Sequence, residues 1–189
     1  MIRRLLALLA LLAVAACGVP VSGQAHRVDP SSVPYDLLST TPPTAPTSAA
    51  GPTAQIYLVS GDHLVARSRH ITGLNIPAEA LRSLLVGPTP AESRHGLTSD
   101  VPAQTRLLSL DLNGSVARVD LSPTFGIAGG SQQVLAIAQI VFTVTASHYI
   151  DGVTFAVDGR PIDVPNGSGS LTPGVKTRAD FRQQGPTGT

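Results

Sequence analysis

Residues 129–147 have the sequence GGSQQVLAIAQIVFTVTAS. Its apolar residues recur at helical spacing, at Val134, Ile137, Ala138, Val141 and Val144. Most residues between them are apolar too, so the predicted helix is apolar nearly all round and has to be covered on most sides. We therefore expect a helix running to about Ser147, with Ser131 as its N-cap, to be the most buried element. Because Gln139–Thr145 is rich in β-branched residues, a strand there is the alternative.

A shorter helix is predicted further toward the N-terminus. Pro77 suits its first turn, because a first turn leaves the backbone N–H unpaired and proline has none. Leu81, Leu84 and Leu85 follow at helical spacing, and Gly87-Pro88 ends the pattern. These features predict a helix with one apolar face.

Three two-residue turns, Gly61-Asp62, Asn113-Gly114 and Asp158-Gly159, predict three β-hairpins. The last two contain residue types that tolerate the positive φ of a type I′ turn. The expected strand pairs are Leu58 with Val65 and Val59 with Leu64, Leu110 with Ala117 and Leu108 with Val119, and Phe155 with Ile162 and Val153 with Val164. In the first hairpin either pair could face inward, and in the third Pro161 confines the return strand to a sheet edge.

These elements follow one another in the order β-β-α-β-β-α-β. Hairpins with interspersed helices favour an α+β fold, a two-layer sandwich in which two helices pack on one face of a mainly antiparallel sheet. The regular patterns begin and end within residues 55–182, where we predict the folded domain, and residues 183–189 are expected to form a flexible tail.

The second hairpin is expected to have one apolar and one polar face. Ser109, Asp111, Arg118 and Asp120 alternate with its apolar residues and should therefore face solvent. In the expected register Arg118 lies within diagonal reach of Asp111, which predicts a modest cross-strand ion pair. This polar face is our candidate interaction surface.

The N-terminus has the features of a secretory signal peptide at residues 1–16, with basic Arg3-Arg4, an apolar run and the small residues Ala15-Ala16. The run is too short for a permanent transmembrane helix, which needs about 18 or more apolar residues. Residues 14–17 (VAAC) resemble a bacterial lipobox. The resemblance implies cleavage after Ala16 and lipidation of Cys17, including palmitate. The alternative is an unmodified thiol beside an ordinary cleavage site.

Residues 17–54 show no apolar period, and residues 31–54 contain five prolines and nine serines or threonines. Such a segment cannot bury enough apolar surface to offset the entropy of its chain. We predict a Pro/Ser/Thr-rich tether that begins at the lipidated Cys17 and holds the domain away from the membrane.

The charge balance argues against a nucleic-acid-binding protein. The chain has 13 basic and 12 acidic residues, and loss of the two signal-peptide arginines leaves 11 and 12. A nearly neutral chain lacks the basic face that binds a phosphate backbone. With the single cysteine lipidated, no thiol remains for a disulfide, a metal site or catalysis.

Catalytic and metal-binding patterns are also missing from the sequence. No two histidines stand at a metal-binding spacing, and only Glu79 and Glu92 could add a glutamate ligand. The histidines are His26, His63, His70, His95 and His148. Ser168 lies in a glycine-rich loop without the G-x-S-x-G pattern of a serine hydrolase. We therefore expect no enzymatic activity, no metal and no cofactor.

Five segments, taken in order, resemble the GerMN domain, the sporulation and spore germination domain also found in actinobacterial lipoproteins. They are ALRSLLVGP at 80–88, GLTSDVP at 96–102, ARVDLS at 117–122, QIVFTVT at 139–145 and VDG at 157–159. The resemblance covers residues 57–163. It implies a fold akin to the ring-building modules of envelope assemblies, with helices packed on a sheet, no established enzymatic activity, and envelope or spore-related partners. The archetypal germination protein has two such domains in tandem, whereas this chain has one.

Together these observations predict a non-enzymatic lipoprotein on the extracytoplasmic face of a bacterial cell membrane, which binds an envelope protein. The alternative is a lipoprotein that binds a small molecule or cell-wall fragment, and the third possibility is a cell-wall hydrolase. A deep apolar cavity would favour ligand binding, whereas a filled core with exposed apolar residues would favour a protein partner.

Replacement of Cys17 tests the predicted anchor. Cys17→Ala should give an unlipidated precursor that no longer partitions with lipoproteins into the detergent phase, because the acyl chains supply the membrane affinity. Phase partitioning and mass spectrometry of the N-terminal peptide measure both effects. An unmodified Cys17 in the wild-type chain would contradict the prediction.

Overall fold

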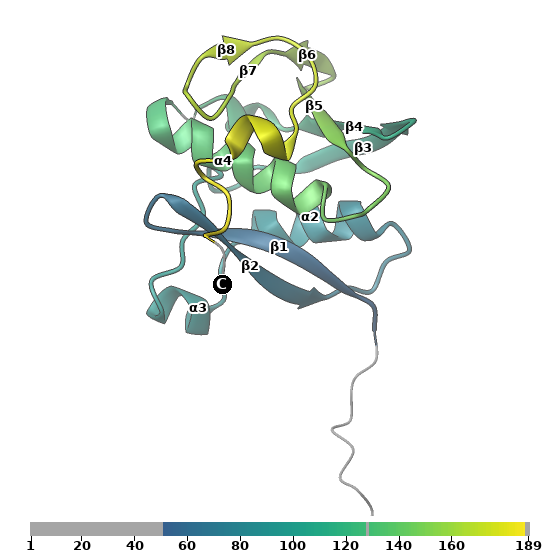
Figure 1. The fold of residues 1–189 in the computed structure, drawn as a ribbon. Coiled ribbons are helices and arrows are strands. Elements are labelled where there is room, and N and C mark those ends of the chain that lie inside the picture. Colours follow the sequence, from purple (N-terminus) through teal and green to yellow (C-terminus); the bar gives the residue numbers. More distant parts are fainter. Residues whose placement is uncertain (1–50, 128, 188–189) are drawn as a thin grey trace, which may run out of the picture. The chain divides into compact units, whose positions relative to one another are not determined.

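The computed structural model describes residues 51–127 and 129–187, which contain eight strands and three α-helices (Figure 1). The strands are β1 (Thr53–Ser60), β2 (His63–His70), β3 (Leu107–Asn113), β4 (Val116–Leu121), β5 (Gly152–Val157), β6 (Arg160–Ile162), β7 (Val164–Pro165) and β8 (Leu171–Thr172). The helices are α2 (Ile76–Val86), α3 (Pro90–Arg94) and α4 (Gly130–Val144), with 3-10 turns at Pro123–Ile127 and Arg178–Phe181. None of the helices in these ranges has the length and hydropathy needed to cross a bilayer.

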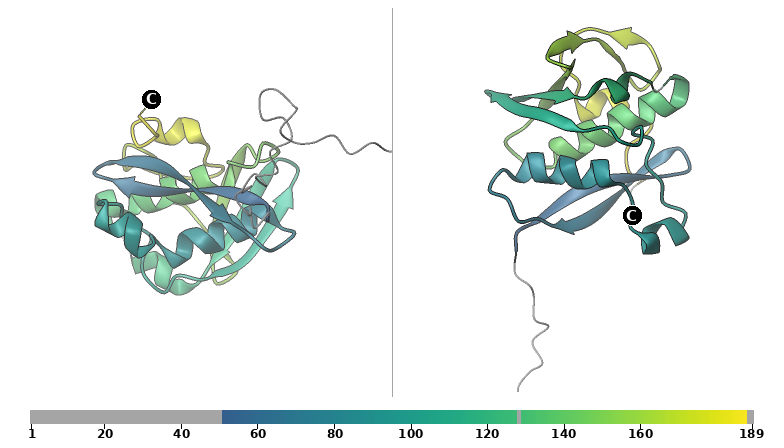
Figure 2. Two further views of the ribbon diagram at one scale, coloured as in Figure 1. Left: turned by 90° about the horizontal axis from the view of Figure 1, so that it is seen from below. Right: turned by 180° about the vertical axis from the view of Figure 1, so that it is seen from behind.

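The helices α2 and α4 lie between two β-layers (Figures 1 and 2). One layer is the hairpin β1–β2, the other is the sheet β3-β4-β5-β6, and β7–β8 forms a small third sheet. The α+β class and the mainly antiparallel pairing are as predicted. The strands do not form one sheet, however, and β4 pairs with β5 in parallel. The parallel pair arises because α4 carries the chain back to the same end of the sheet before β5 begins.

Residues Gly130–Val144 form the helix α4, so the strand alternative for Gln139–Thr145 is wrong. Every residue from Ala136 to Val144 is buried, and this burial on all sides outweighs the low helix propensity of β-branched residues. The predicted cap is also wrong, because Gly129 is the N-cap and makes no side-chain capping bond. The helix therefore starts one residue before Ser131.

The shorter helix matches its prediction in position and in its burial against the core. The side chain of Asn75 accepts a hydrogen bond from the Ala78 N–H at 3.2 Å and caps the helix. Gly87 ends it with a φ of 90°, a conformation that favours glycine. The additional helix α3 was not predicted.

The first hairpin has the predicted register, with Leu58 opposite Val65 and Val59 opposite Leu64. Leu58 and Val59 point to opposite faces of β1, and both are buried, so β1 is covered on both faces. Each of the two strand pairs therefore contributes a buried residue of β1, and neither pair alone faces inward.

The second and third hairpins depart from the predicted pairing. In the second, Leu110 lies opposite Val119 and Leu112 opposite Ala117, because the turn is Gly114-Ser115 rather than Asn113-Gly114. Gly114 takes the positive φ (61°) in the first turn position, as in a type II′ turn. In the third, Phe155 pairs with Ile162 and β6 is an edge strand, as predicted. Val153 does not pair with Val164, because β6 ends at Ile162 and Val164 pairs with Thr172.

The free edge of β1 is closed by a helix and a loop. The Gln139 side chain donates to the Tyr57 carbonyl at 2.8 Å, and Thr143 Oγ1 accepts from the Tyr57 N–H at 3.1 Å. Two positions along, Val59 exchanges both backbone hydrogen bonds with Thr98, each at 2.9 Å. Gln139 Oε1 also accepts from the Asp100 N–H at 2.8 Å. Two polar residues in the buried part of α4, together with the loop at Thr98, thus take the place of a neighbouring strand.

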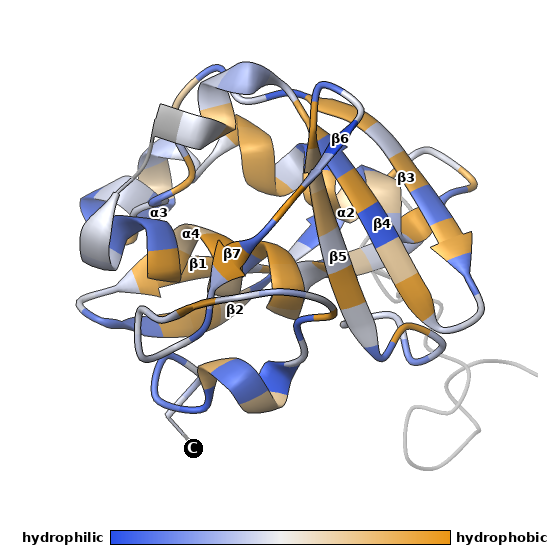
Figure 3. Cartoon of the chain, turned by 90° about the horizontal axis from the view of Figure 1, so that it is seen from above, coloured by the Kyte–Doolittle hydropathy of each residue, from blue (hydrophilic) through white to orange (hydrophobic). Residues whose placement is uncertain are grey.

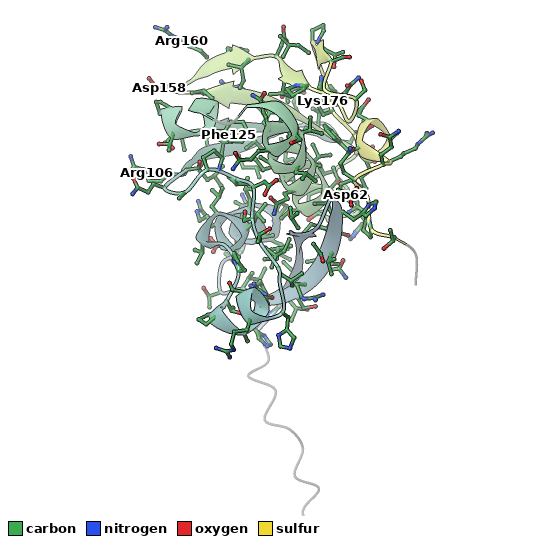
Figure 4. The ribbon with its side chains drawn as sticks, turned by 90° about the vertical axis from the view of Figure 1, so that its left-hand side faces the viewer. Asp62, Arg106, Phe125, Asp158, Arg160 and Lys176 are labelled. Carbon is green, nitrogen blue, oxygen red and sulfur yellow. The ribbon has the colours of Figure 1, made fainter. Side chains whose placement is uncertain are left out.

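The C-terminal segment contacts both α4 and β1 through Arg178. Arg178 donates to the Phe142 carbonyl and to Thr145 Oγ1 at the end of α4, and its guanidinium lies over the Tyr57 and Phe142 rings. Lys176 is 2% exposed (Figure 4), and its ammonium donates to the carbonyls of residues 172, 173 and 174. A buried ammonium needs such acceptors to offset its lost hydration.

The Gln139 contacts can be tested by a substitution of similar size. Gln139→Leu should lower the free energy of unfolding by about 2 to 4 kcal/mol, because each polar group left unpaired in the interior costs about 1 to 3 kcal/mol. Gln132→Leu on an exposed turn of the same helix is the matched control and should change stability little. Urea titrations measure both, and equal effects would contradict this account of β1.

Candidate functional site

The structure brings the four residues of the predicted polar face together on the outer face of β3 and β4. Figure 3 looks onto this face, where hydrophilic and apolar positions alternate along both strands. Ser109 Oγ donates to Asp111 Oδ2 at 2.8 Å. Asp111 lies directly opposite Arg118, and their charged groups are 3.9 Å apart. The predicted cross-strand ion pair is therefore confirmed, in direct rather than diagonal register.

Arg118 and Asp120 hold the turn between β5 and β6. Arg118 Nη2 donates to the Gly159 carbonyl at 2.9 Å, and the Gly159 N–H donates to the Asp120 carboxylate at 3.0 Å. Asp158 and Gly159 both have positive φ (50° and 77°), as the predicted type I′ turn requires. Asp120 is only 7% exposed, so its predicted place in solvent is wrong. The turn that covers Asp120 lies 39 residues further along the chain.

Three apolar side chains lie uncovered at or beside the edge strand β3. Leu108, which was predicted to pair with Val119 in the core, is 49% exposed because a bulge between Leu107 and Ser109 shifts the strand register. Leu112 is also 49% exposed, and Val86 at the end of α2 is 87% exposed. Single exposed apolar residues are common on protein surfaces, whereas three beside one edge strand form a candidate contact surface.

Two hollows on the described surface are open and are lined by both polar and apolar residues. One, of about 520 Å³, lies between β1, α2 and the end of α4, and its lining includes Tyr57, His148, Tyr149 and Arg178. A second, about 450 Å³, lies at the start of α4 beside the loop that contains Ser168. The core itself is filled by side chains from both β-layers and both long helices.

The structure assembles no catalytic group from the residues singled out in the sequence. Within residues 51–127 and 129–187, no three histidine or acidic side chains gather as they would around a metal ion. Ser168 Oγ donates to Asn166 Oδ1 at 2.8 Å and lies 3.1 Å from Ser170 Oγ, neither of which is a general base. His26 and Cys17 lie outside the described residues.

An ion pair that the sequence analysis missed fixes α3 to β2. Arg69 binds both carboxylate oxygens of Glu92, at 2.8 and 2.5 Å. Glu92 also accepts from the backbone and hydroxyl of Thr89, completing a capping box. The Arg69 hydrogen bonds lower the pKa of Glu92 to about 2, helped by Thr89 and opposed by burial. The signal was present as Thr89-Pro90-Ala91-Glu92, a capping-box pattern with proline in the first turn.

Comparisons with known proteins agree with this geometry. Residues 48–163 match the family described as Germane, sporulation and spore germination. The first GerMN domain of the sporulation protein GerM from Bacillus subtilis is 20% identical, with a TM-score of 0.55 over 68% of this chain and 98% of that domain. The tandem GerMN domains of the same protein are 21% identical, with a TM-score of 0.56 over 68% of this chain. This chain spans about half of that tandem structure (47%).

A Clostridium perfringens protein classed provisionally as a lipoprotein is 18% identical over 70% of this chain and 91% of that one, with a TM-score of 0.47. At all these identities the likeness concerns the fold alone. No curated protein matches the chain.

The Glu92 ion pair predicts a pH-dependent stability. A carboxyl whose pKa falls from 4.5 in the unfolded chain to about 2 in the folded one stabilises the fold above pH 4.5. This contribution is lost as the pH falls through about 2. Denaturant titrations should therefore show wild type more stable than Glu92→Gln at pH 6, with the difference shrinking toward pH 2.

The matched control is Glu79→Gln, which breaks an ion pair with Arg82 on the surface of α2. It should change stability by less than about 1 kcal/mol throughout. A difference between wild type and Glu92→Gln that stays constant from pH 6 to pH 2 would contradict the assignment.

Proposed function

The chain belongs to the sporulation and spore germination (Germane) family, as its resemblance to the GerMN domain indicated, and on that basis we propose that it is a non-catalytic interaction module. It binds an envelope protein while anchored to the extracytoplasmic face of the cell membrane by a lipid on Cys17. Its role is to hold that partner at a distance set by the tether of residues 17–54.

One observation carries this proposal: apolar side chains remain uncovered at an edge strand that also carries one member of a charged pair. The buried apolar side chains form one cluster, and the hollows described above are open to solvent rather than enclosed. Interfaces with proteins combine uncovered apolar residues with a polar surround. The uncovered apolar residues here are Val86, Leu108 and Leu112, and the polar groups beside them are Asp111 and Arg118.

The proposed anchor rests on the sequence of residues 1–17. Two arginines, an apolar run and the VAAC motif together direct export and lipidation. A Pro-rich tether extends about 3 Å per residue, so the segment from residue 31 to the start of β1 at Thr53 would reach several tens of ångströms. The partner's binding surface then lies well outside the lipid headgroups.

The groove between β1, α2 and α4 supports the alternative, binding of a small molecule or cell-wall fragment. Tyr149 and His148 at its rim offer ring faces to a sugar, and its volume of about 520 Å³ falls within the range of ligand sites. Arg178, the cation in this groove, is already held by Phe142 and Thr145. For a cell-wall hydrolase, the third possibility, the described part of the chain offers no cluster of three metal-binding side chains.

Site-specific crosslinking in the native envelope tests the proposal. A photoreactive benzoylphenylalanine introduced at Leu112 in the full chain should give a discrete protein adduct. The same residue at Leu74, a fully exposed leucine before α2, should not. With the purified partner, Leu112→Asp should then weaken binding about tenfold or more and Leu74→Asp should not, because a buried, unpaired charge opposes association.

Three outcomes would contradict the proposal. Adducts of glycan alone would favour the alternative, and so would saturable binding of muropeptides in the groove. Release of muropeptides from purified cell wall by the purified chain would favour a hydrolase.

A further inference from the structure

The sheet edges of the domain are protected very unequally. The free edge of β1 is closed by Thr98, Gln139 and Thr143, as described above. At one side of the four-stranded sheet, β6 is only three residues long and contains Pro161. At the other side lies β3, seven residues long and without proline or lysine. Short strands, prolines, covering elements and bulges are the usual means of blocking an edge. Of these β3 has only the bulge at its start, between Leu107 and Ser109, and residues 109–113 pair regularly with β4.

The backbone of β3 presents an open hydrogen-bonding ladder. The two-residue turn Gly114-Ser115 makes Asn113 and Val116 a hydrogen-bonded pair, and such pairs alternate with non-bonded ones. The N–H and C=O groups of Leu110 and Leu112 therefore point away from β4. In the part of the chain that the structure describes, no backbone group bonds to them from that side. Only another extended chain can pair with both positions at once.

The side chains along this edge are apolar. Residues 107–112 read LLSLDL, and their one charge, Asp111, is balanced by Arg118 across the strand pair. Leu108 and Leu112 are half exposed, as noted above. At the start of β3, Leu85, Val86 and Leu107 line a hollow of about 330 Å³ against the end of α2. A strand placed beside β3 would cover these residues.

The same end of the edge is positively charged. Arg82 and Arg106 both line the hollow. The Arg82 guanidinium is bound to Glu79 at 2.6 Å, whereas the exposed Arg106 side chain has no ion pair among the described residues. Arg106, labelled in Figure 4, projects from the surface. A carboxylate at one end of an added strand would meet this charge.

We propose that β3 is completed by an extended segment of a protein partner, which adds a strand beside Leu110 and Leu112. Its apolar side chains cover Leu108, Leu112 and the hollow at Val86, and a carboxylate near one end pairs with Arg106. This is β-strand addition, in which backbone hydrogen bonds supply affinity and side-chain contacts supply selectivity. The inference rests on the proposed function, since it names how the partner is held.

A designed peptide can test strand addition before the partner is identified. The probe is a blocked seven-residue peptide, Glu-Val-Thr-Val-Thr-Val-Ser, and a second version carries the glutamate at its C-terminal end. Both are titrated into the full lipidated chain in detergent micelles, and backbone amide exchange is followed by NMR. Binding should slow exchange at Leu110 and Leu112 about tenfold or more, because those amides become hydrogen-bonded. The amides of Tyr57 and Val59, already bonded, should not change.

Two matched pairs make the test specific. The probe with alternate amides N-methylated should not protect Leu110 or Leu112, because it cannot complete the ladder. Leu112→Pro removes one outward N–H without breaking a bond to β4 and should weaken binding about tenfold or more. Leu112→Ala keeps that N–H and should weaken binding only about threefold. Arg106→Gln should weaken binding and reduce its salt dependence.

Several results would overturn strand addition. They are an absence of protection at millimolar probe, equal protection by the N-methylated probe, or protection confined to the groove between β1 and α4. Protection of Leu110 and Leu112 that rises with protein concentration alone would assign the edge to a second copy of this chain. If the probe fails while crosslinking at Leu112 still captures one envelope protein, strand addition is wrong and the proposed function stands.

Discussion

The fold depends on how α4 is joined to β1. From Ala136 to Val144 the helix is buried on every side, so Gln139 and Thr143 have no solvent and must bond within the protein. They bond to the backbone of Tyr57 at the edge of β1 that faces away from β2. These two hydrogen bonds satisfy the polar side chains of α4 and the backbone groups at the outer edge of β1. They also set the position of α4 along the hairpin β1–β2. The sheet β3-β4-β5-β6 then packs on the opposite side of the same helix.

Local patterns predicted the elements well, because their signals lie within a few residues. The helix at Gly130–Val144, the helix at Ile76–Val86 and the first hairpin register follow from spacing and turn residues. The predictions that failed depended on which of two adjacent residues takes a turn position, or on contacts that no local pattern shows. Glycine took the first turn position at Gly114 and moved the second hairpin by one residue. No pattern around Lys176 shows that carbonyls in its own loop will enclose its ammonium.

The candidate site was predictable as a face but not as a set of contacts. Strict alternation placed Ser109, Asp111, Arg118 and Asp120 on one side of two strands, and they lie there. Alternation cannot show that the turn at Gly159 folds over Asp120, because that turn belongs to a hairpin 39 residues further on. Nor does it show the bulge that exposes Leu108, which depends on the pairing of both strands.

The return of the C-terminal segment has a consequence for the order of folding. The Leu64 N–H of β2 bonds to the Gln184 carbonyl, and Phe181 is fully buried in the core. These contacts join the first hairpin and the core to residues about 120 positions later, and contacts so distant in sequence form slowly. A ribosome or translocon that still holds residues 181–184 therefore keeps the core of the domain incomplete. On the proposed export route, the core stays incomplete until residue 184 has crossed the membrane, so the preceding chain can pass through the translocon without being unfolded.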